Sequence, residues 1–142
     1  MKLIKVKSNN IKISKFLFEL RQKNYVKKNS LNKKKIYFSE HEEWLRNFFL
    51  KKNILFLIYS QKLKVGYVRL EKNRNIFNVS WAIIKKYQKK GLIKKGVKIA
   101  TKNKNYKYKA IIRKNNIASK KIALNANFKL RYSKDEIDYY FK

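Results

Sequence analysis

A short glycine-bearing segment is the part of this sequence whose residue types and spacing best fit a chemical task. Residues 85–96 read KKYQKKGLIKKG and hold two of the three glycines of the chain. An apolar run over 76–84 precedes the segment, and a helical pattern over 92–102 follows it. A strand that passes through a glycine turn into a helix leaves the first helical amides unpaired, and these amides attract an anion. The segment therefore predicts a phosphate-binding turn.

Gln88 and Gly91 are the informative residues of this turn. Gly91 would let the backbone pass close to a pyrophosphate, and the lysines around it would add only screened, non-specific attraction. These lysines are Lys89, Lys90, Lys94 and Lys95. The same residues also fit a plain strand-to-helix turn whose lysines face water, so the short motif alone leaves both interpretations open.

The composition bears on the choice of partner. The 142 residues carry a formal net charge of +31, which by itself indicates a polyanion such as RNA. Lysine outnumbers arginine 33 to 6, and the chain is rich in asparagine and isoleucine and has no proline. Lysine, asparagine and isoleucine have A/T-rich codons, whereas proline has G/C-rich ones. We therefore attribute most of the charge to genome composition and expect nucleic acid not to be the partner.

Thiol chemistry and targeting are both constrained. The chain has no cysteine, so disulfides, zinc thiolates and thiol nucleophiles are not available to it. The first ten residues lack the apolar core of a signal peptide. The longest apolar run, ILFLIY over 54–59, has the length of a strand and not of a membrane span. We expect a cytoplasmic protein without a membrane segment.

Hydrophobic spacing predicts one domain over residues 1–142, a mixed α/β (α+β) sandwich in the order β-α-α-β-β-β-α-β-α-β-β. The predicted strands span 2–7, 53–60, 63–71, 76–84, 107–113, 128–133 and 137–141. The predicted helices span 14–24, a stretch from residue 39, 92–102 and 116–125. SEHE over 39–42 indicates a capping box with Ser39 as N-cap and Glu42 as its partner. The polar link over 26–35 is expected to be irregular or briefly helical.

This order and several motifs resemble the GNAT superfamily of acetyl-CoA-dependent N-acetyltransferases over about residues 12–141. The acetyl-CoA loop of that family reads Q/R-x-x-G-x-G/A after the fourth strand, which Gln88 and Gly91 match. Its next helix often begins N-x-A-S, which Asn116 and Ser119 match. The resemblance implies the GNAT fold, acetyl-CoA as co-substrate and no metal. It assigns cofactor contacts to Trp81, Ala82, Ile83, Gln88, Lys89, Lys90, Gly91, Leu92, Ile93, Asn116 and Ser119.

The N-terminal half is similar to a narrower branch that acetylates amino sugars linked to nucleotides, such as the UDP-linked 4-amino-dideoxy sugar of the pseudaminic acid pathway. FELRQ at 18–22, IYFSEHEEWL at 36–45 and VGYVRLE at 65–71 carry this likeness. It implies a role in surface glycan synthesis, with Arg21 and Arg69 on the nucleotide diphosphate. Terminal strands often mediate dimers in this superfamily, so the resemblance also allows a homodimer.

His41 and Glu71 are the candidate bases for deprotonating the substrate amine. His41 is the only histidine, and an ordinary pKa near 6.5 suits proton transfer, although the same residue fits a half-buried helix position equally well. Glu71, at the end of the predicted strand 63–71, is the alternative base or a substrate contact. Its structural alternative is a surface carboxylate among lysines.

Two positions depart from the family pattern. Ile93 stands where the acetyl-CoA loop usually has a small residue, so the pyrophosphate turn could be looser or shifted. Ala123 stands where many relatives carry a tyrosine thought to protonate the departing thiolate. Activity does not require that tyrosine, because a thiol with a pKa of about 8.5 is a tolerable leaving group near neutral pH.

Two other functions stay open at this level. A GNAT enzyme could instead acetylate a peptide α-amine, a lysine or a polyamine, although a strongly cationic enzyme would repel a free polyamine. A protein of another class, a small RNA-binding or ribosome-associated protein, would bind RNA with a steep dependence on salt. The enzyme would instead be stabilised saturably by acetyl-CoA.

Overall fold

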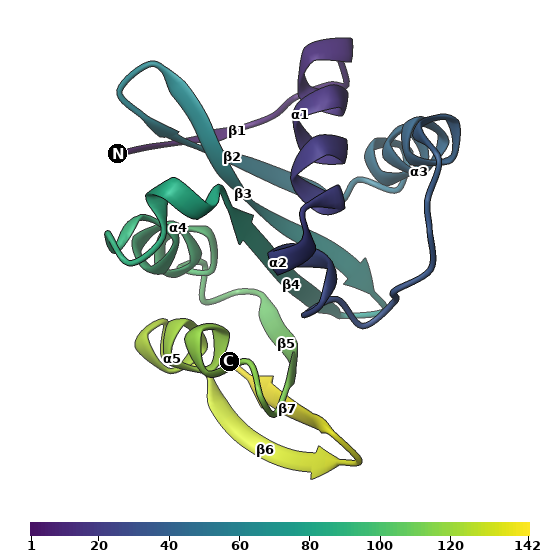
Figure 1. Ribbon diagram of the computed structural model, residues 1–142. Coiled ribbons are helices and arrows are strands. Elements are labelled where there is room, and N and C mark those ends of the chain that lie inside the picture. Colours follow the sequence, from purple (N-terminus) through teal and green to yellow (C-terminus); the bar gives the residue numbers. More distant parts are fainter.

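The computed structural model describes all 142 residues, which fold around one seven-stranded mixed sheet (Figure 1). The strands are β1 (Lys2–Lys5), β2 (Ile54–Ser60), β3 (Leu63–Asn73), β4 (Ile76–Ile83), β5 (Lys107–Arg113), β6 (Lys129–Lys134) and β7 (Ile137–Phe141). The helices are α1 (Ile11–Gln22), α2 (Asn24–Lys27), α3 (Phe38–Leu50), α4 (Leu92–Ala100) and α5 (Ile117–Asn125), with a 3₁₀ turn at Lys85–Tyr87.

The sheet combines an antiparallel meander with one parallel crossover. The strand order is β1-β2-β3-β4-β5-β7-β6, and β1 to β4 pair antiparallel as a meander. The crossover through α4 brings β5 parallel to β4, and β7 and β6 then add antiparallel. The mixed α/β class and the predicted element order are therefore confirmed. The short helix α2 reaches into the polar link, which was expected to be irregular or briefly helical, and the 3₁₀ turn at Lys85–Tyr87 is an addition.

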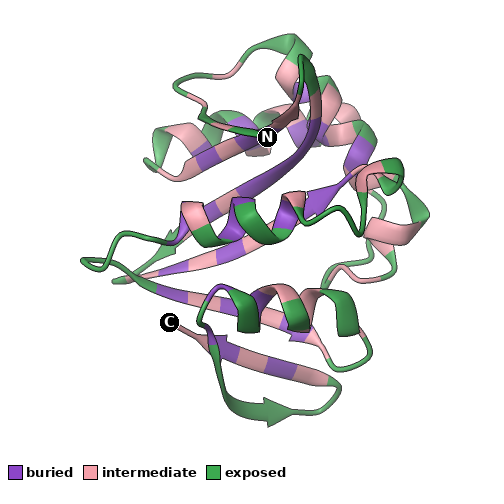
Figure 2. Cartoon of the chain, turned by 90° about the vertical axis from the view of Figure 1, so that its left-hand side faces the viewer, coloured by how far each residue is buried: buried purple, intermediate pink, exposed green.

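Helices cover both faces of the sheet and separate two apolar cores. α1 and α3 lie on one face, where Leu17 and Leu45 belong to a cluster with Leu55 of β2. α4 and α5 lie on the other face, where Val97 and Ala123 belong to the larger cluster. Figure 2 shows buried and less buried residues alternating along β5 and β7, as expected for strands covered on one face. None of the helices combines the length and the apolar character that crossing a bilayer would need.

The first helix starts earlier than predicted. α1 begins at Ile11, because the Asn10 side chain accepts a hydrogen bond from the Ile13 amide (2.9 Å) and caps the helix there. The sequence predicts a start at Ser14, three residues later, because the helical spacing of Phe16 and Leu20 alone defines the pattern. α4 stops at Ala100, two residues before the predicted end at Lys102.

The capping box predicted over residues 39–42 is wrong in its residues. α3 begins at Phe38, so Ser39 lies inside the helix and not at the N-cap. The Glu40 carboxylate, and not that of Glu42, accepts the hydrogen bond from the Tyr37 amide (3.3 Å). Phe38 packs edge-on against Phe18 at 5.2 Å between ring centroids. This aromatic contact stabilises the earlier start.

Gly66 lies where β3 and β4 approach too closely for a side chain. A Cβ atom at Gly66 would lie 2.6 Å from the carbonyl oxygen of Ala82, so the backbone would have to move. We expect Gly66→Ala to lower the free energy of unfolding by about 2 kcal/mol. Gly96→Ala is the matched control, since its Cβ would meet the movable end of Ile58 (2.9 Å) and alanine favours a helix by about 1 kcal/mol. Urea unfolding measures both; equal losses would contradict the backbone explanation.

Candidate functional site

β4 and β5 separate after three paired residues. Parallel pairing joins Ile76–Asn78 to Lys107–Lys109, but β4 continues to Ile83 and β5 to Arg113. The strands therefore diverge, and the later backbone groups of β4 have no strand partner on that side. This splay leaves one edge of β4 open along its C-terminal half.

The backbone groups that face the gap belong to every second residue of β4. The Ile84 amide donates to the Val65 carbonyl (2.8 Å) across the β3–β4 ladder. Because hydrogen-bonded pairs alternate along an antiparallel ladder, Ala82 also bonds to β3, whereas Trp81 and Ile83 direct their N–H and C=O groups toward the gap. An extended ligand that carries amide groups could bond to this edge as an added strand.

The turn before α4 presents a row of uncommitted amides. Lys89 and Gly91 both adopt positive φ angles, of 60° and 75°, which curl the backbone ahead of the helix. None of the amides of residues 89–94 donates a hydrogen bond within the chain, and the first helical bond runs from the Lys95 amide to the Gly91 carbonyl (3.0 Å). Free amides in such a turn at a helix N-terminus form a site for an anion.

The N-terminus of α5 differs, because it is already capped. Asn116 Oδ1 accepts a hydrogen bond from the Ser119 amide (3.2 Å). The side-chain nitrogen of Asn116 therefore remains to contact a ligand, and the capping and contact roles can coexist.

A cleft of about 570 Å³ opens along the splayed strands and continues to the α1–α2 region. Most of the predicted cofactor residues line it, namely Trp81, Ala82, Ile83, Gln88, Lys89, Ile93, Asn116 and Ser119. Lys90, Gly91 and Leu92 belong to the adjoining turn and do not line the cleft itself. The charged side chains that line the cleft are all cations, namely Arg21, Lys27, Lys28, Lys34, Arg69 and Lys89.

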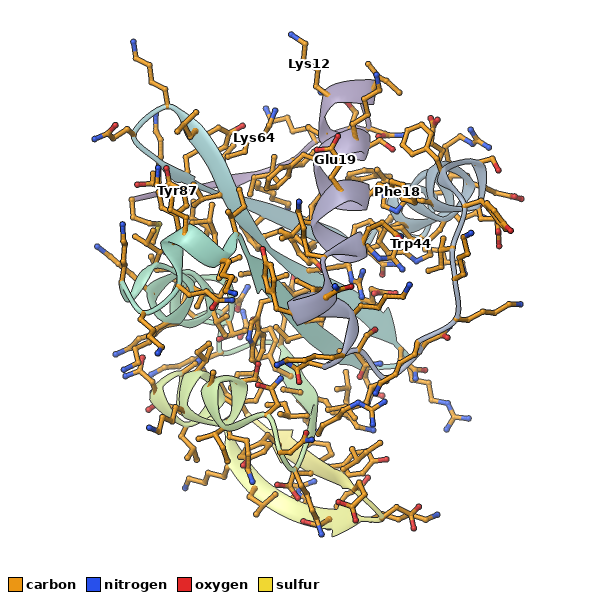
Figure 3. All side chains as sticks on the ribbon, viewed as in Figure 1. Lys12, Phe18, Glu19, Trp44, Lys64 and Tyr87 are labelled. Carbon is orange, nitrogen blue, oxygen red and sulfur yellow. The ribbon has the colours of Figure 1, made fainter.

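Arg21 of α1 and Arg69 of β3 share one aromatic platform at the far end of the cleft. Each guanidinium carbon lies 4.9 Å from the centroid of the Trp44 indole, which Figure 3 shows between α1 and α3. Arg69 Nε lies 2.7 Å from Glu71 Oε1, so Glu71 neutralises Arg69 and does not line the cleft. Arg21 has no carboxylate partner; burial and, second, the charge of Arg69 lower its pKa. An anion at this end of the cleft would supply the missing counter-charge.

His41 is buried behind Arg21 and does not line the cleft. Its Nε2 lies 3.1 Å from the Ser14 carbonyl, which can only accept, so Nε2 carries the proton. Nδ1 then accepts from Arg21 Nη1 at 3.0 Å. Burial and, second, the charge of Arg21 lower the pKa of His41 to about 4. The lone pair that a base needs is used to hold Arg21, so this geometry favours a positioning role over the base role inferred from the sequence.

The lowered pKa of His41 predicts a pH-dependent stability. Because the unfolded chain takes up this proton near pH 6.5 and the folded chain only near pH 4, stability is complete above pH 6.5 and is lost as pH falls through this window. The shift corresponds to about 3 kcal/mol, which partial screening reduces to roughly 2 kcal/mol. His41→Gln should lack this loss in urea unfolding at pH 6.5, 5.5 and 4.5. An equal pH slope in both proteins would assign the loss to the carboxylates.

Sequence reasoning missed the segment that closes the cleft. Arg113, at the end of β5, donates to the Ser30 carbonyl through Nε (3.1 Å) and Nη2 (2.9 Å). The Tyr25 hydroxyl accepts a hydrogen bond from the Lys85 amide (2.9 Å). These bonds hold the polar link over the cleft, so that its lysines line it. The sequence gives no local signal for this, because the partners lie 83 and 60 residues away along the chain.

Solved structures of several acetyltransferases share this fold at low sequence identity. Spermidine N-acetyltransferase from Vibrio cholerae, in complex with CoA and spermine, has a TM-score of 0.79 and 15% identity over 98% of this chain and 92% of that chain. Ribosomal-protein-alanine N-acetyltransferase from Brucella melitensis has a TM-score of 0.76 and 15% identity over 99% of this chain and 97% of that chain. The N-acetyltransferase PseH of Campylobacter jejuni, in complex with acetyl coenzyme A, has a TM-score of 0.71 and 16% identity over 99% of this chain and 96% of that chain. No protein-family model matches the chain, and no curated protein sequence matches it significantly.

The chain therefore has the GNAT acetyltransferase fold. The residues present also fit acetyl-CoA, because the free amides over 89–94 suit a pyrophosphate and the open edge of β4 suits an amide-bearing arm. Two of these names state different acceptors, spermidine and an alanine of a ribosomal protein, and the name of PseH states none, so the likeness does not select among amine substrates.

Proposed function

We propose that this protein is an acetyl-CoA-dependent N-acetyltransferase that acts on the amine of a nucleotide-linked amino sugar in surface glycan synthesis. The observation that carries the proposal is that the open edge of β4 and the turn with free amides lie along one cleft. CoA joins an arm with two amides to a pyrophosphate, and these are the two groups that the edge and the turn suit.

In this assignment the chain binds the co-substrate mainly through its backbone. Trp81 and Ile83 hold the pantetheine arm, and one amide of β4 polarises the thioester carbonyl. The side-chain nitrogen of Asn116 contacts the arm. Ile93 contacts the co-substrate only through its backbone amide, because its side chain is 8% exposed and packs in the larger core. Acetyl-CoA supplies the acetyl group as a thioester.

The acceptor end of the cleft favours an anionic substrate. Arg21 lacks a carboxylate partner and suits a phosphate group, and Arg69, which is paired with Glu71 through Nε, lies beside it on the same aromatic platform. A cleft whose charged side chains are all cations disfavours a free polyamine such as spermidine. These contacts support a nucleotide-linked amine over a polyamine as the acceptor.

A panel of acceptors tests the proposal. CoA release would be followed with acetyl-CoA and, in turn, a UDP-linked 4-amino-4,6-dideoxy-N-acetyl-altrosamine, spermidine and a peptide with a free N-terminal alanine. At about 0.15 M salt we expect the sugar to have a kcat/KM on the order of 100-fold above the other two, the worth of one paired charge-assisted contact. Turnover of the peptide alone would overturn the sugar assignment and keep acetyl transfer.

A further inference from the structure

We propose that the lysines of the link over the cleft, Lys27, Lys28 and Lys34, keep the acceptor amine neutral and stabilise the departing thiolate, in place of a side-chain base and a side-chain acid. The inference rests on the proposed function and deepens it, because it states how the site handles protons. It also assigns a task to a segment that neither the sequence motifs nor the cofactor contacts explain.

The titratable groups that face the cleft come from α1, α2, the link, β3 and the turn before α4, and none comes from β4, β5 or α5. Besides the three lysines, the cations are Arg21 from α1, Arg69 from β3 and Lys89 from the turn before α4. The remaining titratable groups are the phenols of Tyr25 and Tyr67, and the Tyr25 hydroxyl already accepts from the Lys85 amide. None of the three lysines of the link has a carboxylate partner, because the two ion pairs of the chain are Arg69–Glu71 and Lys120–Asp138.

The link holds its lysines in place over the cleft. Two bonds from Arg113 fix the Ser30 carbonyl. The Ser30 hydroxyl donates to the Asn32 carbonyl (3.0 Å), and the Asn32 side-chain oxygen accepts from the Lys34 amide (3.0 Å). The backbone that carries the lysines is therefore anchored to β5 and braced internally, and all three lysines line the cleft.

Nearby cations favour both ionisation changes that the reaction needs. Loss of a proton from an ammonium removes positive charge, and ionisation of a thiol adds negative charge, so a positive potential lowers the pKa of both groups. The ammonium releases one proton to water. The amine lone pair then forms the C–N bond to the acetyl carbon, and the C–S bond breaks with its electron pair on sulfur. The nitrogen loses its second proton to water, and the thiolate takes one up from water according to pH.

The pH dependence of turnover tests this inference. With the UDP-linked amino sugar, the acid limb of kcat/KM should follow the pKa of the free amine, whereas the acid limb of kcat should lie about one pKa unit lower, because kcat reports the bound amine. Lys28→Gln/Lys34→Gln should raise the kcat limb by about half a unit. Lys12→Gln/Lys64→Gln removes the same charge at the exposed Lys12 of α1 and the half-buried Lys64 of β3, neither of which lines the cleft, and should leave the limb unchanged (Figure 3).

Calorimetry gives a second readout that needs no turnover. With CoA present, binding of the amino sugar at the pKa of its free amine should release about half a proton, seen as a heat that changes with the ionisation enthalpy of the buffer. The N-acetylated sugar should release none. Binding without proton release, or a kcat limb at the pKa of the free amine, would overturn the inference and leave the proposed function standing. Failure of the sugar to bind would overturn both.

Discussion

Gly91→Asp is expected to weaken acetyl-CoA binding about 100-fold without unfolding the protein. The new carboxylate would lie at the N-terminus of α4, next to the free amides over 89–94. There it would accept hydrogen bonds from these amides and repel the pyrophosphate. The repulsion between two unit charges about 4 Å apart is between 1 and 4 kcal/mol, depending on exposure, and this range includes the energy of a 100-fold loss of affinity. Titration calorimetry with acetyl-CoA measures the change.

Gly91→Asn is the matched control for the charge. Asparagine has the same shape as aspartate and tolerates the positive φ of 75° at this position as well as any residue with a side chain. No heavy atom lies within 4 Å of the position that a Cβ would take at Gly91. We therefore expect Gly91→Asn to retain binding within about tenfold. Equal weakening by both variants would show that backbone shape, and not anion binding, governs this turn.

Arg21→Gln is expected to weaken binding of UDP to the CoA-bound protein about 30-fold and to leave acetyl-CoA binding unchanged. Arg21 stacks on Trp44, contacts His41 and has no carboxylate partner, so the ligand supplies its counter-charge. A charge-assisted hydrogen bond contributes roughly 1.5 to 3 kcal/mol, which corresponds to this loss. Calorimetry with UDP and with acetyl-CoA separates the two ends of the cleft.

Arg46→Gln is the control for this second substitution. Arg46 is exposed on α3 and does not line the cleft, so the substitution removes the same charge without changing the platform of Trp44. We expect UDP to bind Arg46→Gln as it binds the unchanged protein. If Arg46→Gln lost as much affinity as Arg21→Gln, the attraction would come from the overall charge and not from the site.

The architecture was predictable because hydrophobic spacing is local. The meander, the crossover and the turn at Gln88–Ile93 all follow from the spacing of apolar residues and one glycine. Ile93 became interpretable only in three dimensions, since its side chain packs into the core and leaves the amide for the turn. Ala123 is fully buried and does not line the cleft, so this position contributes no group to the site.

The acceptor end was less predictable because its contacts are long-range. The sequence singled out Arg21, Arg69 and His41, but it did not show that Trp44 carries both guanidiniums. Nor did it show that the lone pair on His41 Nδ1 accepts a hydrogen bond from Arg21. A single histidine in a helical pattern gives no indication of whether its side chain is buried or exposed. Such pairings depend on how α1 and α3 meet over the sheet, which residue spacing within either helix does not specify.

Thermal unfolding with acetyl-CoA tests the central claim most directly. At about 0.15 M salt and an acetyl-CoA concentration about 100 times Kd, mass action contributes roughly 2.7 kcal/mol. For a chain of this size we expect Tm to rise by roughly 8 °C and then saturate. A short RNA should shift Tm little at this salt concentration. An unchanged Tm with both acetyl-CoA and CoA at millimolar concentration, beside a salt-sensitive rise with RNA, would contradict the account.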